Sequence, residues 1–220
     1  AAPLPCEGGS YSSATDNDEP GDCTPADPGS FAVTGSIEQT PCSPGTFSAL
    51  AGQSFCEKCP AGEYQDAIGT TECKACEKGS YCAAGAAAAL PCEAGSYSSA
   101  TNLTDASECT AADPGYFAVT GSTQQMPCAK GSYTNASMPV KGSCTLCAGG
   151  TYQHESGQTA CKPCEQGRYC EPGAAAPLPC EGGSYSSATD NDEPGDCTPA
   201  DPGSFAVTGS IEQTPCSPGT

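Results

Sequence analysis

Nineteen cysteines recur along this 220-residue chain at spacings that repeat. From Cys6 the steps are 17, 19, 14, 3, 14, 3 and 6 residues, and from Cys92 they are 17, 19, 16, 3, 14, 3 and 6. The two halves are 86 and 88 residues long, and one two-residue insertion accounts for the difference. Residues 1–46 return unchanged as residues 175–220, so the full period is 174 residues. This periodicity predicts an array of similar units in place of one globular core.

A shorter motif, C-x-x-G-x-[Tyr/Phe], begins about every 17 residues within each half, and we call each such unit a module. Twelve of the 14 aromatic residues occupy its last position, Phe55 and Tyr116 being the exceptions. The glycine permits the positive φ of a tight turn. The aromatic is the one large apolar group, so we expect it to cover the disulfide and pack on the next module. No apolar pattern of period 3.6 occurs. The predicted fold is a small disulfide-rich repeat, an elongated ladder of short β-hairpins and coil with essentially no helix.

The repeat predicts three segments of the chain. Residues 1–91 form a first half-repeat, residues 92–179 a second, and residues 180–220 the truncated start of the next repeat. We expect the sequence to be a window on a longer tandem array. Identity over 46 residues would follow from recent duplication of the encoding DNA or from tiling of one repeat.

Composition and charge restrict the class of protein. Gly (27) and Pro (21) are abundant, Trp is absent, and cysteine content near 9% marks a disulfide scaffold of an oxidising, extracellular compartment. Seven basic against 26 acidic residues give a net charge of −19, which disfavours nucleic acid and anionic lipid as partners. No run of 18 apolar residues is present, so no membrane contact is expected within this segment.

Cysteine pairing follows from modules that have lost two cysteines together. Where a module opens with alanine, as at Ala26, its closing cysteine is also missing, and Gln39 stands in that place. The same joint loss occurs at Ala112 with Gln125 and at Ala200 with Gln213. Loss in pairs is what a bonded pair predicts, because an orphan thiol is a liability in a secreted protein. We therefore pair each opening cysteine with the next cysteine: Cys6–Cys23, Cys42–Cys56, Cys59–Cys73, Cys76–Cys82, Cys92–Cys109, Cys128–Cys144, Cys147–Cys161, Cys164–Cys170 and Cys180–Cys197. Cys216 is left over.

Two other uses of the cysteines were weighed against disulfides. Cys56, Cys59, Cys73 and Cys76 have a spacing near that of a zinc ribbon, but zinc would leave the other cysteines unassigned. A redox C-x-x-C needs a strand–helix context, which the sequence lacks. Neither a metal site nor a cofactor is therefore predicted.

The remaining polar motifs favour surface roles. The run Asp16 to Asp22 matches part of a calcium loop, but Pro20 and the missing terminal glutamate favour a solvated turn, with weak calcium binding as the alternative. His154 is the only histidine and reads as a surface loop residue, without the partners of a catalytic site.

Two sequons, Asn102-Leu103-Thr104 and Asn135-Ala136-Ser137, predict N-linked glycans in loops of the second half. Asn135 lies in the one lengthened module, whose loop we expect to bulge outward. Ser-Pro, Thr-Pro and Ala-Pro dipeptides offer further sites for O-linked sugars.

The run CEKCPAGEYQDAIGTTECKAC (residues 56–76) resembles the cysteine-rich repeats of ephrin-receptor-like type, which are likened to tumour necrosis factor receptor modules. The junctions GSYCAAGAAAALPCEAGSYSS and GRYCEPGAAAPLPCEGGSYSS share this resemblance, which extends as a pattern over nearly the whole chain. It implies disulfide-laddered rods in ectodomains and large surface proteins. Long arrays are also similar in architecture to extracellular fibres of algae and related protists, flagellar hairs (mastigonemes) among them. The cysteine-free modules, such as ADPGSF, depart from the family.

Together these features predict a non-catalytic structural protein. We expect a secreted, glycosylated segment that self-associates in an extracellular filament or surface fibre. The alternative is a rod-like stalk or ligand-binding ectodomain of a cell-surface receptor or adhesin.

Overall fold

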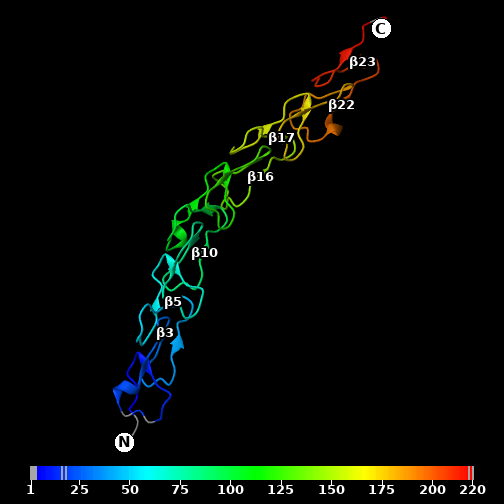
Figure 1. Ribbon diagram of the computed structural model, residues 1–220. Helices are drawn as coiled ribbons and strands as arrows, with labels where there is room; N and C mark the ends of the chain where they lie inside the picture. The colour runs from blue at the N-terminus through cyan, green and yellow to red at the C-terminus, as the bar shows by residue number, and fades with distance from the viewer. Residues whose placement is uncertain (1–3, 16, 18, 218, 220) are drawn as a thin grey trace. The chain divides into compact units, whose positions relative to one another are not determined.

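The computed structural model describes residues 4–15, 17, 19–217 and 219. Its strands are all two residues long, and each pairs with its neighbour along the chain in a two-stranded hairpin (Figure 1). The strands up to residue 97 are β1 (Ser10–Tyr11), β2 (Thr24–Pro25), β3 (Ser30–Phe31), β4 (Thr40–Pro41), β5 (Thr46–Phe47), β6 (Glu57–Lys58), β7 (Glu63–Tyr64), β8 (Lys74–Ala75), β9 (Ser80–Tyr81), β10 (Leu90–Pro91) and β11 (Ser96–Tyr97). The later strands are β12 (Thr110–Ala111), β13 (Tyr116–Phe117), β14 (Met126–Pro127), β15 (Ser132–Tyr133), β16 (Thr145–Leu146), β17 (Thr151–Tyr152), β18 (Lys162–Pro163), β19 (Arg168–Tyr169), β20 (Leu178–Pro179), β21 (Ser184–Tyr185), β22 (Thr198–Pro199), β23 (Ser204–Phe205) and β24 (Thr214–Pro215).

Helical structure in the described residues is limited to single 3-10 turns. These are η1 (Pro20–Asp22), η2 (Ala106–Glu108) and η3 (Pro194–Asp196), each in the longest loop type, where the closing cysteine lies 17 residues after the opening one. The prediction of short hairpins, coil and disulfides is therefore confirmed.

Two compact units make up the chain. One comprises Ala1–Glu93, Tyr97–Thr110 and Gly121–Gln124, and the other comprises Ala94–Ser96, Ala111–Thr120 and Gln125–Thr220. The same module geometry recurs inside both units.

Each module begins with a tight turn whose third residue is the motif glycine. In the module that opens at Cys42, the N–H of Thr46 donates to the carbonyl of Ser43 (3.0 Å), and Gly45 has φ 83°. A positive φ at this place is the type II arrangement, which favours proline before the glycine, as in Pro44. The turn places β5 opposite β6, so that Cys42 and Cys56 meet at the base of the hairpin.

Successive modules are joined by a regular set of backbone hydrogen bonds. The N–H of each motif glycine donates to the carbonyl of the residue that follows the aromatic of the next module, as from Gly45 to Gln65 (2.7 Å) and from Gly131 to Gln153 (2.7 Å). The carbonyl of the opening residue accepts in turn from a loop glycine of the next module, as from Gly69 to Cys42 (2.8 Å). Because these bonds use backbone atoms, they repeat although the loop sequences vary.

Modules also approach their second neighbours closely. A Cβ built on Gly29 would lie 2.2 Å from the carbonyl oxygen of Gly69, two modules further on. Gly131 and Gly173 have the same relationship at 2.1 Å. A side chain at either motif glycine would collide with backbone, so these glycines serve both the turn and the crossing.

The core consists of sulfur, small side chains and a few polar groups. The opening cysteines are buried, and Ala26 and Ala112 take their place where cysteine is missing. The aromatics on the last motif position are half-buried or exposed, and are not core residues. Among the largest fully buried side chains is Gln153, directly after an aromatic, and Gln65 is 3% exposed in the same place. Their amide groups replace lost water contacts with bonds inside their own loops, for example from Gln153 Nε2 to the carbonyl of Ala160 (2.8 Å).

Candidate functional site

Nine disulfides form the chemical framework of the described chain. Each opening cysteine is bonded to the next cysteine, in the pairing that joint loss predicts: Cys6–Cys23, Cys42–Cys56, Cys59–Cys73, Cys76–Cys82, Cys92–Cys109, Cys128–Cys144, Cys147–Cys161, Cys164–Cys170 and Cys180–Cys197. Cys216 is a free, exposed thiol. The four cysteines with zinc-like spacing belong to three different disulfides, and the described residues contain no cluster of three or more metal-ligand side chains.

An Asp–Gln pair occupies the place of the disulfide in the modules that lack cysteine. Gln39 Oε1 accepts from the backbone N–H of Asp27 (2.6 Å), and Gln39 Nε2 donates to Asp27 Oδ2 (2.8 Å). We call this arrangement the Asp–Gln clamp. It recurs with the same two bonds at Asp113/Gln125 (2.7 and 2.7 Å) and at Asp201/Gln213 (2.7 and 2.6 Å). Sequence reasoning recorded the glutamines only as missing cysteines, although an aspartate precedes each by 12 residues.

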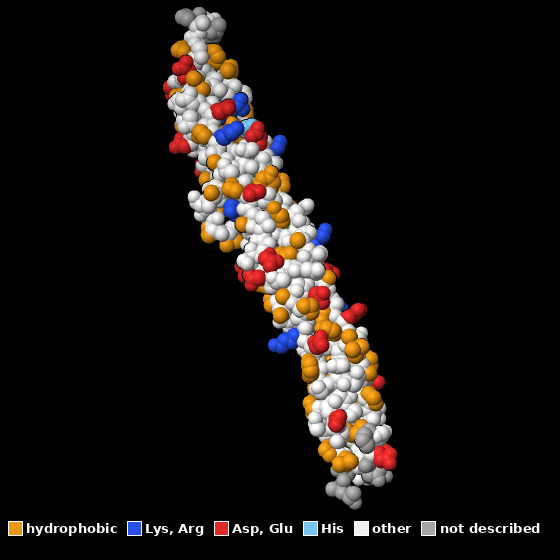
Figure 2. Space-filling view, turned by 90° about the vertical axis from the view of Figure 1, so that its left-hand side faces the viewer, with side chains coloured by type: hydrophobic (Ala, Val, Ile, Leu, Met, Phe, Trp, Pro, Cys, Tyr) orange, Lys and Arg blue, Asp and Glu red, His pale blue; other side chains and the backbone are white. Residues whose placement is uncertain are grey.

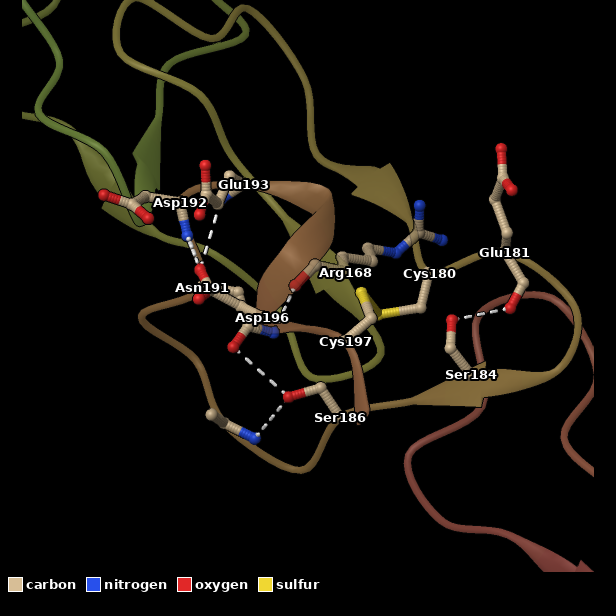
Figure 3. Close-up of a disulfide and its surroundings, with 11 residues drawn as sticks. Arg168, Cys180, Glu181, Ser184, Ser186, Asn191, Asp192, Glu193, Asp196 and Cys197 are labelled. Carbon is tan, nitrogen blue, oxygen red and sulfur yellow. Dashed lines mark hydrogen bonds between the residues drawn. A yellow bond between two sulfur atoms is a disulfide. The ribbon is translucent and has the colours of Figure 1, made fainter. Parts of the chain in front are cut away.

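The acidic run is a capped turn in its second copy, residues 190–196 (Figure 3). Asp196 Oδ2 accepts from the backbone N–H groups of Asp192 (2.8 Å) and Glu193 (3.2 Å), and these bonds lower the pKa of Asp196 below its ordinary value of 3.8. Asn191 is buried, donates to the carbonyl of Arg168 (2.8 Å) and accepts from Ser186 Oγ (3.2 Å). The side chains of Asn191 and Asp196 are thus turned to the fold itself. In the first copy, Asp16 and Asp18 lie outside the described residues.

Leu103 fills the buried place that Asn191 takes in the other half. It is 5% exposed, and its carbonyl accepts from Cys82 (2.8 Å) as that of Asn191 accepts from Cys170 (3.0 Å). The backbone therefore holds this position inward for either side chain.

The sequon residue Asn102 is exposed and has φ 61°, the only positive φ of a non-glycine residue in the described chain. Its N–H donates to the carbonyl of Cys76 (2.9 Å), a bond that glycines such as Gly69 and Gly85 make in other modules. Asparagine tolerates this left-handed conformation better than most residues. The hydroxyl of Thr104, the third sequon residue, donates to Glu108 Oε1 (2.6 Å).

The sequon residue Asn135 is half-buried at the start of the lengthened loop. Its Oδ1 accepts from the N–H of Ser137 (3.0 Å), which closes a local turn through the sequon. The equivalent loop of the first half has no sequon. It carries the exposed side chains Leu50 and Phe55 instead, beside a small hollow that Phe47 also lines.

His154 is an exposed residue, as expected. Its Nδ1 is 3.4 Å from Lys162 Nζ, and its Nε2 is 3.7 Å from Glu155 Oε1. The first half has Asp66 and Lys74 at the matching positions, joined by an exposed ion pair, and the Lys74 hydrogen bond lowers the pKa of Asp66. Neither pair is buried, so both read as surface contacts.

Charged side chains are spread over the face shown in Figure 2, and the basic ones stand singly. No helix among the described residues has the length and apolar character needed to cross a bilayer.

Comparison with protein families places the repeats. Segments 29–76, 45–88 and 137–177 match the model of the tyrosine-protein kinase ephrin type A/B receptor-like family. Together they cover slightly less than half of the chain, and they include modules of both halves. A comparison with curated proteins finds no match. These matches, with nine disulfides in a repeated hairpin module, make the chain a cysteine-rich repeat protein of ephrin-receptor-like type.

Proposed function

We propose that the chain is a structural repeat segment of a secreted, glycosylated extracellular filament or surface fibre. Its role is non-catalytic: it supplies length and repeated contact surfaces outside the cell. Receptor-like cysteine-rich repeats and a dense disulfide framework both support an extracellular, oxidising location.

The observation that carries this proposal is the 174-residue period. Residues 1–46 and 175–220 are identical, and the contacts that join modules are the same backbone bonds in each. A protein whose modules contact mainly their neighbours can be lengthened without changing any unit. Identical units then offer identical surfaces at fixed intervals, which is what a periodic assembly of copies requires.

Glycans are the second part of the proposal, at Asn102 and Asn135. Asn102 has an exposed side chain, held where other modules place glycine. The bond of Asn135 engages its Oδ1 and not Nδ2, the atom that carries an N-linked sugar. Both sites would recur every 174 residues, and sugars there would keep neighbouring chains soluble and apart. O-linked sugars at the Ser-Pro and Thr-Pro dipeptides are a further part of the proposal.

The family match favours a second candidate, a stalk or ligand-binding ectodomain of a receptor or adhesin. The same hairpin array would then hold a binding head away from the membrane. The two candidates differ in whether many copies assemble together.

Immunogold electron microscopy of native cells would separate them. An antibody to residues 1–46 should label filaments at regular intervals if the chain is a fibre segment. Label scattered singly over the cell membrane, with no filament, would contradict the fibre and favour the stalk.

Self-association in solution gives an independent test. The net charge of −19 opposes lateral contact at low ionic strength, and salt screens that repulsion within about 8 Å at 0.15 M. Sedimentation velocity of Cys216→Ser, which lacks the free thiol, should show a mass that rises with salt and protein concentration. A monomer at every salt and protein concentration would count against the fibre.

A further inference from the structure

Disulfides divide the chain into closed loops and open connections of very unequal length. Connections between consecutive disulfides are mostly 3 residues long, as from Cys56 to Cys59. From Cys23 to Cys42 the connection is 19 residues, because the module between them is closed by the Asp–Gln clamp. The segment from Cys109 to Cys128 has the same length and its own clamp.

We propose that the modules closed by the Asp–Gln clamp are reversible extension elements: under tension they open and lengthen the chain, while disulfide-closed modules keep their length. This adds a mechanical function to the structural one. It concerns the single chain, so it holds for a fibre or a stalk.

The path of an applied force supports this division. In the module that opens at Cys42, tension crosses the disulfide, whose Cα atoms are 5.7 Å apart, and the 14-residue loop is bypassed. In the module that opens at Ala26, no covalent bond joins the two sides, and tension must pass along the main chain. It is resisted there by two-residue strands, contacts with neighbouring modules and the two bonds between Gln39 and Asp27. Asp27 is exposed, so water can replace the clamp bonds as they break.

Opening such a module also releases a useful length. A 19-residue connection spans at most about 65 Å when fully extended, against about 10 Å for a 3-residue one. The chain can refold afterwards, because the disulfides on either side keep the flanking modules in place.

The test is single-molecule force spectroscopy of the oxidised 220-residue chain, held by its two ends. We expect two extension steps of up to about 65 Å from the internal clamped segments, reproducible over repeated pulling cycles without reductant. In Ala26→Cys/Gln39→Cys, with closure of the new pair first established by mass spectrometry, one of these steps should disappear. Dithiothreitol should restore it.

A matched pair of variants tests the clamp itself. Gln125→Ala removes both clamp bonds to Asp113 and should lower the opening force of one step, while Gln124→Ala, at the exposed neighbouring residue, should leave both steps unchanged. The proposal is overturned if the oxidised double-cysteine variant keeps both long steps. It also fails if the native chain yields none before the tether breaks, or if Gln125→Ala opens at the same force as Gln124→Ala.

Discussion

Gln39 is bonded twice to Asp27, once to its backbone N–H and once to its carboxylate, at the point where a disulfide joins Cys42 to Cys56 in the next module. Both arrangements close a hairpin of the same register type, Phe31 opposite Thr40 in one and Phe47 opposite Glu57 in the other. The clamp provides about 1–3 kcal/mol from two hydrogen bonds. A disulfide contributes about 2–4 kcal/mol, and only the disulfide survives unfolding.

The first prediction concerns local opening of a clamped module. Gln125→Ala should raise amide hydrogen exchange in residues 112–128 about tenfold, since it removes two bonds to Asp113. Exchange measured by mass spectrometry, with Gln124→Ala as control, checks this. Equal exchange in the two variants would show that the clamp does not hold the module closed.

Reduction should abolish the fold, whereas EDTA should leave it intact. The buried side chains are mostly cysteines, alanines and small polar groups, so the apolar contacts are too few without the covalent links. Circular dichroism and hydrogen exchange under oxidising and reducing conditions test this. Loss of order with EDTA alone would point to a metal.

The disulfides should also differ in how quickly they are reduced. Both cysteines of Cys76–Cys82 are fully buried, while Cys73 of the bond Cys59–Cys73 is half-buried. A reducing thiolate must reach a sulfur atom, so Cys59–Cys73 should open several-fold sooner. Timed alkylation with peptide mapping would reveal the order, and the opposite order would contradict the prediction. Cys164–Cys170 offers the same comparison with Cys147–Cys161.

Glycine substitution can separate backbone strain from steric collision. Gly29 and Gly203 lie in identical local sequences and have φ 85° and 89°, yet a Cβ on Gly29 would meet Gly69 O at 2.2 Å and one on Gly203 would meet nothing within 4 Å. Both alanine variants carry the strain of a positive φ, and only Gly29→Ala carries a collision, which costs about 1–3 kcal/mol more. Hydrogen exchange around each site measures the difference. Similar losses of protection would mean that the crossing gives way at little cost.

Asn102 allows a test of glycosylation that spares the fold. Asn102→Gly removes the acceptor and places at φ 61° the residue that other modules use there, so stability should change by less than about 1 kcal/mol. Glycopeptide mass spectrometry of native material should find a sugar on Asn102 and on Asn135, and none on residue 102 of the variant. Unmodified asparagine at both positions would leave these loops as plain polar turns.

Acid should loosen the turn η3. The N–H groups of Asp192 and Glu193 lower the pKa of Asp196 below 3.8, so its contribution is complete above the unfolded value and is lost as pH falls through the lower, folded one. NMR of the Asp192 amide should therefore show its bond intact at neutral pH and weakened below 3.8. In Asp196→Asn this pH dependence should vanish. A wild-type amide that does not respond to acid would exclude Asp196 as its anchor.

The disulfide framework was accessible from sequence because a disulfide is a property of two residues, and Ala26 and Gln39 reveal the pair by losing both members at once. The hairpins were accessible because glycine, aromatic and cysteine hold fixed offsets. The clamp was not, since its second bond depends on the orientation of the Asp27 side chain. Gln153 also escaped sequence reasoning: a polar residue after an aromatic looks like loop, yet backbone bonds from a neighbouring module draw it inside.

The close approach of Gly29 to Gly69 has a genetic consequence. A module that contacts both its first and its second neighbour needs at least three consecutive modules to complete its surroundings, which sets the smallest piece that can be gained or lost without damage. Unequal crossing-over between copies joins equivalent glycines, and every such junction restores the same backbone contacts. Lengthening by whole repeats is therefore structurally silent, and copy number can drift while the module itself stays under selection.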